Sequence, residues 1–244
     1  MKVVFLGATR GMGRALARKM SKRGDVLFLL GRDPADLERS AADLGVDGAK
    51  PAGVAACDLE DPATFEPALD AAAAALGSFD AVVVTAGIFA TQEVLESDAE
   101  LCRRVLEVDF TNTVLFCEAS RRRLLDQGGG TLVVFSSVAG ERGRKPVVLY
   151  GAAKAGLSRY LEGLDHRYKA AGLNVVTVKP GFVKTSLTQG LKPPPFAGEP
   201  EDVADRVLAA IDRRAPVVYA PAAWGPIMNV IRRLPRFVMR RVGF

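Results

Sequence analysis

The chain has 244 residues, 49% of them hydrophobic and 25% charged, which fits a globular chain with one core and excludes a disulfide-stabilised miniprotein or wholesale disorder. It has one histidine, His166, and three cysteines, Cys57, Cys102 and Cys117, with no CxxC spacing, so we expect buried thiols and no metal site. The net charge is +5, but residues 213–244 carry seven arginines and no acid, so residues 1–212 have a net charge of −2. A nucleic-acid-binding domain usually carries its positive charge on a face of the fold, so this distribution argues against such a function.

Apolar strands alternate with helices along the chain. We expect strands over 2–6, 26–30, 53–57, 81–84, 131–135, 174–178 and 217–219. Helical patterns lie between them, over 11–23, from 34, over 62–77, 97–125, 147–171 and 201–213, with Asp33-Pro34 and Asp61-Pro62 as start signals. Buried strands joined by helices predict one α/β domain, a Rossmann-type doubly wound parallel sheet of seven strands over residues 1–220, followed by an extension over 221–244.

The first strand runs into a glycine-rich turn and then a helix. Gly7, Gly11 and Gly13 are spaced for a tight turn that lets the backbone approach a pyrophosphate at the helix start. This context favours a dinucleotide site over glycines that serve only the turn.

The end of the second strand indicates which dinucleotide binds. An NAD site places an acid there for the ribose hydroxyls, whereas this strand ends in Gly31-Arg32. Arg32, helped by Arg10, is suited to a 2′-phosphate, so NADP(H) is preferred. The alternative is that both arginines are solvated or that one pairs with Asp33.

A phenol and an ammonium share one helix face further along the chain. Tyr150 and Lys154 are one turn apart, and the lysine charge lowers the pKa of the phenol. Ser137 follows the fifth strand, at the edge of the sheet where ligands bind in such folds. The three groups form a candidate acid–base site.

The ordered motifs GATRGMG (7–13), CDL (57–59), TAG (85–87), SSVAG (136–140), YGAAK (150–154) and PGFVKT (180–185) resemble the short-chain dehydrogenase/reductase family. The resemblance implies that Tyr150 donates a proton, that Ser137 holds the substrate oxygen, and that Lys154 binds the nicotinamide ribose and tunes Tyr150. It further implies a cofactor site formed by Gly7, Thr9, Arg10, Gly11, Met12, Gly13, Arg32, Asp58, Leu59, Ala86, Gly87, Tyr150, Lys154, Pro180, Gly181, Val183 and Thr185.

Two positions depart from the family pattern. Thr85 stands where the family usually has Asn, and its hydroxyl replaces part of the lost hydrogen bonding. Asp109 stands where the family usually places the Asn of its catalytic tetrad. If Asp109 is ionised near Lys154, it offsets the lysine charge and raises the pKa of Tyr150.

The C-terminal segment has apolar residues at helical spacing, Ile227, Val230, Ile231, Leu234 and Val238, and arginines on another face. We expect a basic amphipathic helix kinked at Pro235. Two roles stay open: contact with an anionic membrane surface, or packing against the domain or a partner subunit.

The second half is also similar to a narrower family, the mycobacterial-type reductases of decaprenylphosphoryl-2-keto-ribose. The predicted function is NADPH-dependent reduction of a ketone to a secondary alcohol, on a lipid-linked keto sugar. Alternatives are a 3-oxoacyl or hydroxysteroid-type carbonyl reductase and a non-catalytic NADP-sensing regulator.

The resemblance also implies a homodimer or homotetramer formed through the helices at about 97–125 and 147–171. Only six residues precede Gly7, and no apolar run reaches the roughly 18 residues of a spanning helix. We therefore expect a cytoplasmic protein, with peripheral membrane contact through the extension as the added possibility, and no nucleic-acid partner.

Overall fold

The computed structural model describes residues 1–243, which form one seven-stranded parallel sheet. The strands are β1 (Lys2–Leu6), β2 (Val26–Gly31), β3 (Gly53–Ala56), β4 (Ala81–Val84), β5 (Gly130–Phe135), β6 (Leu173–Pro180) and β7 (Val217–Ala220). Their order is β3-β2-β1-β4-β5-β6-β7, as the doubly wound prediction requires. The order reverses between β1 and β4, and at such a point the carboxyl ends of the strands leave a crevice for ligands.

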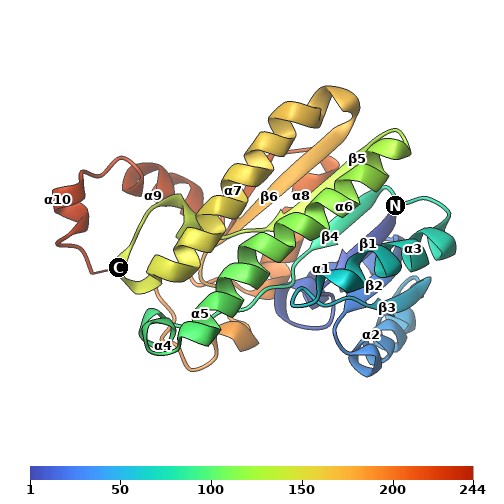
Figure 1. The fold of residues 1–244 in the computed structure, drawn as a ribbon, viewed down its shortest axis with the longest axis horizontal. Helices are drawn as coiled ribbons and strands as arrows, with labels where there is room; N and C mark the ends of the chain where they lie inside the picture. The colour runs from blue at the N-terminus through green and yellow to red at the C-terminus, as the bar shows by residue number, and fades with distance from the viewer. Residues whose placement is uncertain (244) are drawn as a thin grey trace.

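Helices cover both faces of the sheet (Figure 1). One layer contains α1 (Gly11–Lys22), α2 (Pro34–Asp47) and α8 (Pro200–Asp212), and the other contains α3 (Phe65–Leu76), α6 (Thr113–Asp126) and α7 (Val148–Tyr168). Successive residues of β1 alternate between the two layers, Val3 and Phe5 toward the first and Val4 toward the second. Because strand side chains alternate, a fully apolar strand of this kind must be covered on both sides.

The predicted helix over 97–125 is the main element that the structure corrects. A separate helix that was not predicted, α4 (Gln92–Ser97), precedes this region, which itself contains α5 (Ala99–Leu106), a π-helical segment at Glu107–Asn112, and then α6. Asp98 separates the first two helices, because its side chain accepts a hydrogen bond from Leu101 N at 2.9 Å and so caps α5. The π-helical segment carries Asp109 into the interior, where its exposed fraction is 0%.

Short 3₁₀ turns join several elements of the fold. They are η1 (Pro62–Thr64), η3 (Val138–Glu141), η4 (Lys145–Val147), η5 (Lys169–Ala171) and η6 (Ser186–Thr188). The thiols of Cys57 and Cys117 are buried, as predicted, while Cys102 is half-buried.

The C-terminal segment forms two short helices, α9 (Trp224–Ile231) and α10 (Arg236–Met239), beyond the edge of the sheet (Figure 1). The prediction of one kinked helix is wrong, because α9 ends at Ile231 and Pro235 is the N-cap of a second helix. The predicted apolar face is only partly correct: Ile231 packs against Val138, whereas Val230 is 62% exposed. Over residues 1–243, no helix combines the length and the apolar character that crossing a bilayer requires.

Candidate active site

The turn between β1 and α1 holds the backbone close to the crevice. Gly7 and Gly11 have positive φ angles of 97° and 52°, which favour glycine. A Cβ atom on Gly13 would lie 2.1 Å from Gly7 O and 2.5 Å from Thr85 Oγ1. Within residues 1–243, no side chain caps the start of α1 and no acid lies in its first turn, so its free N–H groups suit a phosphate.

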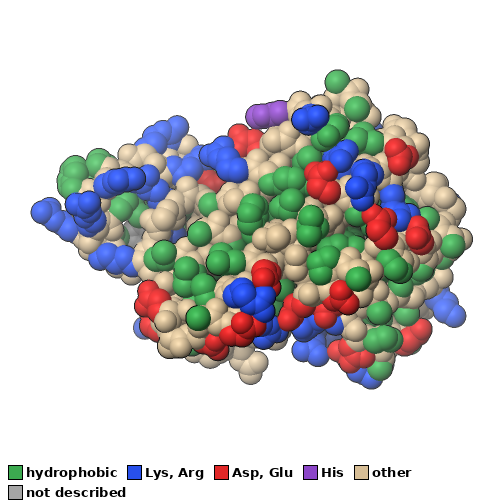
Figure 2. Space-filling view, in the orientation of Figure 1, with side chains coloured by type: hydrophobic (Ala, Val, Ile, Leu, Met, Phe, Trp, Pro, Cys, Tyr) green, Lys and Arg blue, Asp and Glu red, His purple; other side chains and the backbone are tan. Residues whose placement is uncertain are grey.

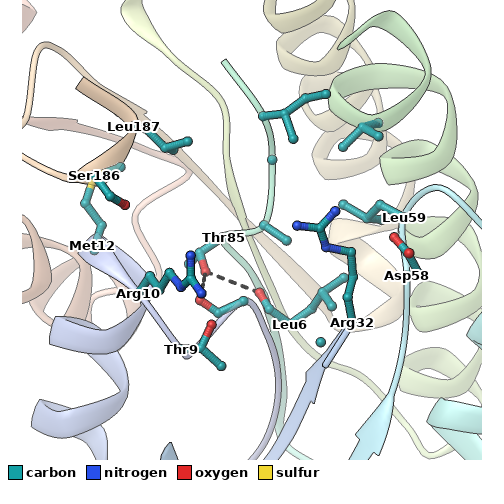
Figure 3. Close-up of a pocket in the computed structure, with 18 of the residues that line it drawn as sticks. Leu6, Thr9, Arg10, Met12, Arg32, Asp58, Leu59, Thr85, Ser186 and Leu187 are labelled. Carbon is teal, nitrogen blue, oxygen red and sulfur yellow. Dashed lines mark hydrogen bonds between the residues drawn. The ribbon is translucent and has the colours of Figure 1, made fainter. Parts of the chain in front are cut away.

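Thr85 performs the hydrogen-bonding role expected for it. Its hydroxyl donates to Gly7 O at 2.9 Å and lies 3.2 Å from Leu6 O, and Figure 3 shows these contacts under the glycine turn. The side chain therefore ties the end of β4 to the turn after β1.

A cavity of about 290 Å³ opens where the loops after β1, β2, β3, β4 and β6 meet (Figure 3). The predicted cofactor residues that line it are Gly7, Thr9, Arg10, Gly11, Met12, Gly13, Arg32, Asp58, Leu59, Ala86, Gly87 and Thr185. Sequence reasoning missed Leu6, Gly31, Cys57, Glu60, Thr85, Ile88, Val108, Ser186 and Leu187 as lining residues. A glycine turn at a free helix start, continuous with a partly apolar cleft, fits a dinucleotide.

Two arginines line this cavity, and acidic side chains of the protein neutralise their charges only weakly. The side chains of Arg10 and Arg32 are 75% and 64% exposed, and their carboxylate contacts are single, 3.2 Å to Asp36 and 3.4 Å to Glu60. Asp33 pairs with neither of them in the ion pairs between described residues, since its carboxylate caps α2 through backbone N–H groups. Both guanidinium groups retain donors for a phosphate.

Five predicted cofactor residues lie outside this cavity: Tyr150, Lys154, Pro180, Gly181 and Val183. Val183 is a core residue that is 2% exposed. Gly181 lies under the indole of Trp224, because a Cβ atom on Gly181 would be 1.9 Å from Trp224 Nε1. The C-terminal segment therefore occupies the space above the end of β6.

The turn after β5 packs directly on α7. Ser136 Oγ donates to Lys154 O at 3.0 Å. A Cβ atom on Gly140 would lie 2.5 Å from Lys154 C, and one on Gly151 would lie 2.9 Å from Ala139 O. The small residues of the two motifs are thus required for close contact, which fixes Ser137 relative to the phenol and ammonium on α7.

Tyr150 lies among the groups that control its proton. The Lys154 Nζ atom is 5.6 Å from the centre of the phenol ring, and Phe89 packs edge-on at 5.1 Å. Burial raises the pKa of Tyr150, the Lys154 charge lowers it, the Asp109 charge raises it, and the hydroxyl of Ser137 lowers it, with a net rise. The phenol is therefore held as an acid beside a hydroxyl.

Asp109 and Lys154 form a buried ion pair, as the sequence analysis had considered. Lys154 Nζ is 3.3 Å from Asp109 Oδ1, which also accepts from Ile88 N at 3.1 Å. Burial raises the pKa of Asp109 against the opposing effect of Lys154. Burial by itself lowers the pKa of Lys154, but Asp109 and Tyr150 raise it above the usual value, so the ammonium keeps its charge.

Gln92 is a structural contributor that sequence reasoning missed. Its Oε1 accepts from Val148 N at 2.8 Å and from Leu149 N at 3.1 Å. These N–H groups belong to the first turn of α7, where helices lack internal partners. Gln92 thereby anchors the start of the helix that carries Tyr150, and no local pattern in the sequence marks either it or Phe89.

The arrangement is chemically suited to proton transfer. A phenol that lies between a serine hydroxyl and a lysine ammonium can pass its proton to an oxygen bound beside it. The hydroxyl then serves as a second hydrogen-bond donor to that oxygen. The adjacent cavity fits a dinucleotide, so the site combines a proton donor with a place for a redox cofactor.

Comparison with known proteins places this site in context. A family model described as short chain dehydrogenase matches residues 1–195. An uncharacterised oxidoreductase of Mycobacterium tuberculosis is 33% identical over 240 residues, which cover 98% of this chain and 96% of the relative.

Solved structures share the fold at lower identity. A short-chain dehydrogenase from Sphingobium yanoikuyae in complex with NADPH superposes with a TM-score of 0.81 and 24% identity, over 96% of this chain and 97% of the other. A short chain dehydrogenase/reductase from Burkholderia phymatum in complex with NAD has a TM-score of 0.82 and 24% identity, with 93% and 92% coverage.

The charge on Asp109 predicts a pH effect. In the Asp109→Asn variant the pKa of Tyr150 falls, because the carboxylate that raises it is gone. A reaction that needs the protonated phenol should then lose rate at a lower pH than in the parent protein. The pH dependence of kcat measures this, and an unmoved profile would mean that Asp109 has only a structural role in the π-helical segment.

Proposed function

The chain belongs to the short-chain dehydrogenase family, and on that premise we propose that it reduces a ketone to a secondary alcohol with NADPH. The observation that carries the proposal is the Lys154 ammonium 5.6 Å from the ring of Tyr150, whose pKa the Ser137 hydroxyl also lowers, next to a cavity that fits a dinucleotide. A non-catalytic sensor of NADP has no need of this proton donor, so we favour the enzyme.

In the proposed reaction the bound nicotinamide supplies a hydride to the carbonyl carbon. The Tyr150 hydroxyl gives its proton to the carbonyl oxygen, and Ser137 Oγ donates a hydrogen bond to that oxygen as negative charge develops. Lys154 stabilises the phenolate that Tyr150 leaves behind. Asp109 holds the ammonium in place through its 3.3 Å contact, which makes it a positioning residue.

The preference for NADPH rests on the two arginines at the end of the cavity. A 2′-phosphate needs donors and positive charge, and Arg32 follows β2 at the position where an acid would repel it. The solved structures of similar fold include two complexes with NADPH and one with NAD, so the proposal of NADPH is supported by this chain's own arginines.

The remaining predicted residues keep their roles as part of the proposal. Asp58 and Leu59 would contact the adenine, and Ala86 and Gly87 would line the middle of the cofactor. Gly181, Val183 and Thr185 would hold the nicotinamide end; of these, Thr185 lines the cavity.

The substrate that we propose is a ketone on a lipid-linked sugar, delivered at an anionic membrane surface. Phe237 is 62% exposed on the C-terminal segment, and Figure 2 shows Lys and Arg side chains gathered over this end of the molecule. Arg236, Arg240 and Arg241 pair with no acid among the described residues. An exposed aromatic ring among unpaired arginines suits a layer of anionic headgroups.

We further propose that two copies associate through the helical face formed by α5, α6 and α7. Four large apolar side chains on this face are 36% to 52% exposed: Leu106, Phe110, Leu115 and Val148. Figure 2 shows hydrophobic side chains spread over it. A second copy would remove this surface from water.

The proton-donor role predicts a large effect of Tyr150→Phe. The variant should lose about 100-fold or more of NADPH oxidation, because general-acid catalysis contributes at least that much. The assay uses keto sugars, 3-oxoacyl thioesters and steroid ketones as acceptors. Tyr160→Phe is the matched control, since Tyr160 lies on the same helix and bonds Glu118 instead. Equal rates for the parent and Tyr150→Phe on every acceptor would contradict the assignment.

The cofactor preference predicts a selective effect of Arg32→Ala. Loss of a charge-assisted hydrogen bond to the 2′-phosphate should raise the KM for NADPH by about tenfold or more, with a much smaller change for NADH. Arg39→Ala is the control for the loss of one positive charge, because Arg39 lies on α2 and pairs with Asp36. Equal changes for the two cofactors would mean that Arg32 does not contact the phosphate.

The membrane contact predicts a salt-dependent affinity for anionic vesicles. Replacing Arg236, Arg240 and Arg241 by Gln in the full-length protein should weaken co-sedimentation with phosphatidylglycerol vesicles at low salt, by about 1 kcal/mol for each charge. A control with Lys22, Arg39 and Arg159 changed to Gln alters the net charge equally. If both triple variants bind like the parent, the segment does not serve as a membrane contact.

A further inference from the structure

Two buried donors, one in the segment after β5 and one in the segment after β7, have no acceptor among the described residues. Among the described residues, Arg144 Nε and Trp224 Nε1 are enclosed side-chain atoms without a hydrogen-bond partner. Buried polar groups in folded proteins are nearly always paired, so an unpaired donor calls for an explanation. Both residues lie in segments that follow sheet strands at the carboxyl edge, where ligands bind in this kind of fold.

Trp224 packs on a residue that is adjacent in sequence to a contact of Ser137. Its indole lies on Gly181, where an added Cβ would be 1.9 Å from Nε1. Gly181 follows Pro180, whose carbonyl oxygen is 3.5 Å from Ser137 Oγ. The indole N–H therefore lies on Gly181, the residue directly after Pro180, whose carbonyl contacts Ser137.

Arg144 lies in the loop between η3 and α7, which joins Ser137 to Tyr150 in the chain. Within the part of the chain that the structure describes, Arg144 takes part in no ion pair, although it is half-buried. Burial lowers the pKa of its guanidinium, yet arginine stays charged in proteins. A half-buried positive charge without a counter-charge, with its Nε enclosed, favours an anion from outside the chain.

The neighbouring charges in this loop are already matched. Glu141 Oε2 is 2.9 Å from Arg232 and accepts a hydrogen bond from Tyr219 OH at 3.2 Å, and Oε1 pairs with Lys179. Arg142 donates to Leu234 O at 2.8 Å. These contacts bind the loop to the C-terminal segment and leave Arg144 as its half-buried cation without a partner.

We propose that Arg144 and Trp224 bind an anionic group of the substrate, a phosphate or a carboxylate, while the ketone of the same molecule faces Ser137 and Tyr150. This inference rests on the proposed reductase function and narrows its substrate class. The guanidinium supplies charge and paired N–H groups, and the indole supplies one directed N–H. A neutral apolar ketone of the steroid type satisfies neither donor.

The kinetic test compares carbonyl compounds that differ in one charge. Dihydroxyacetone phosphate is compared with dihydroxyacetone, and 3-oxooctanoate with its ethyl ester. The first pair tests recognition of a phosphate and the second tests recognition of a carboxylate. The parent should favour the charged member of at least one pair in kcat/KM. Arg144→Gln should reduce that ratio by about tenfold or more, through KM. Arg213→Gln, at an exposed arginine after α8, is the control and should keep the ratio.

Trp224 provides a second readout because it is the only tryptophan in the chain. With NADP⁺ saturating, titration with the preferred charged compound should change the Trp224 emission, and Arg144→Gln should weaken the apparent affinity by a similar factor. Trp224→Phe keeps a stacked ring without the N–H and should lower the charged-to-neutral ratio by a smaller amount.

The outcomes separate the inference from the function on which it rests. If the parent reduces charged and neutral members equally and Arg144→Gln behaves like Arg213→Gln, the anion site is wrong, while loss of rate in Tyr150→Phe still supports the reductase. If no compound is reduced but the charged one changes the emission in an Arg144-dependent way, the anion site stands and the reductase proposal fails. Unchanged emission together with an unchanged ratio overturns the inference.

Discussion

The ion pair between Lys154 and Asp109 is the constraint around which the catalytic end is built. Lys154 is 4% exposed and Asp109 is 0% exposed, so each charge depends on the other for stabilisation, and removal of one partner leaves an uncompensated buried charge. Space is limited as well: a Cβ atom on Gly87 would lie 2.6 Å from Asp109 Oδ1. The π-helical segment at Glu107–Asn112 brings the carboxylate into this space, where a π-bulge of the kind often found at functional sites replaces regular helix.

This pair also joins the cavity to the proton-transfer groups. Gly87 lines the cavity on one side and approaches Asp109 on the other, and Ile88, another lining residue, donates its N–H to the same carboxylate oxygen. A molecule that moves the loop after β4 therefore acts on Asp109 directly, and through the 3.3 Å contact on Lys154. Two adjacent backbone positions, Gly87 and Ile88, thus connect the cavity with the carboxylate that raises the pKa of Tyr150.

The sequence was informative where the physical cause is local. Apolar runs such as Val3–Leu6 identify buried strands, Asp33 before a proline identifies a capped helix start, and the spacing of Tyr150 and Lys154 fixes their shared face. It was uninformative where the cause is a contact between distant segments. Gln92 caps a helix that begins 56 residues later, and Trp224 covers Gly181 from beyond the last strand. The π-helical segment at Glu107–Asn112 was missed, because the helical pattern of the sequence continues through it.

The C-terminal segment shows why its two predicted roles need not compete. Met228 and Ile231 are buried toward Val138, and Arg232 pairs with Glu141, so the inner side packs on the domain as one alternative required. Pro235 then turns the chain, and the outer side presents Phe237 and arginines to solvent. Positive charge at the rim of a site raises the rate at which anions arrive. If the substrate carries an anionic group on a lipid, the same arginines that would meet a headgroup layer would also direct that group toward Arg144, which lies in the loop that the segment holds in place.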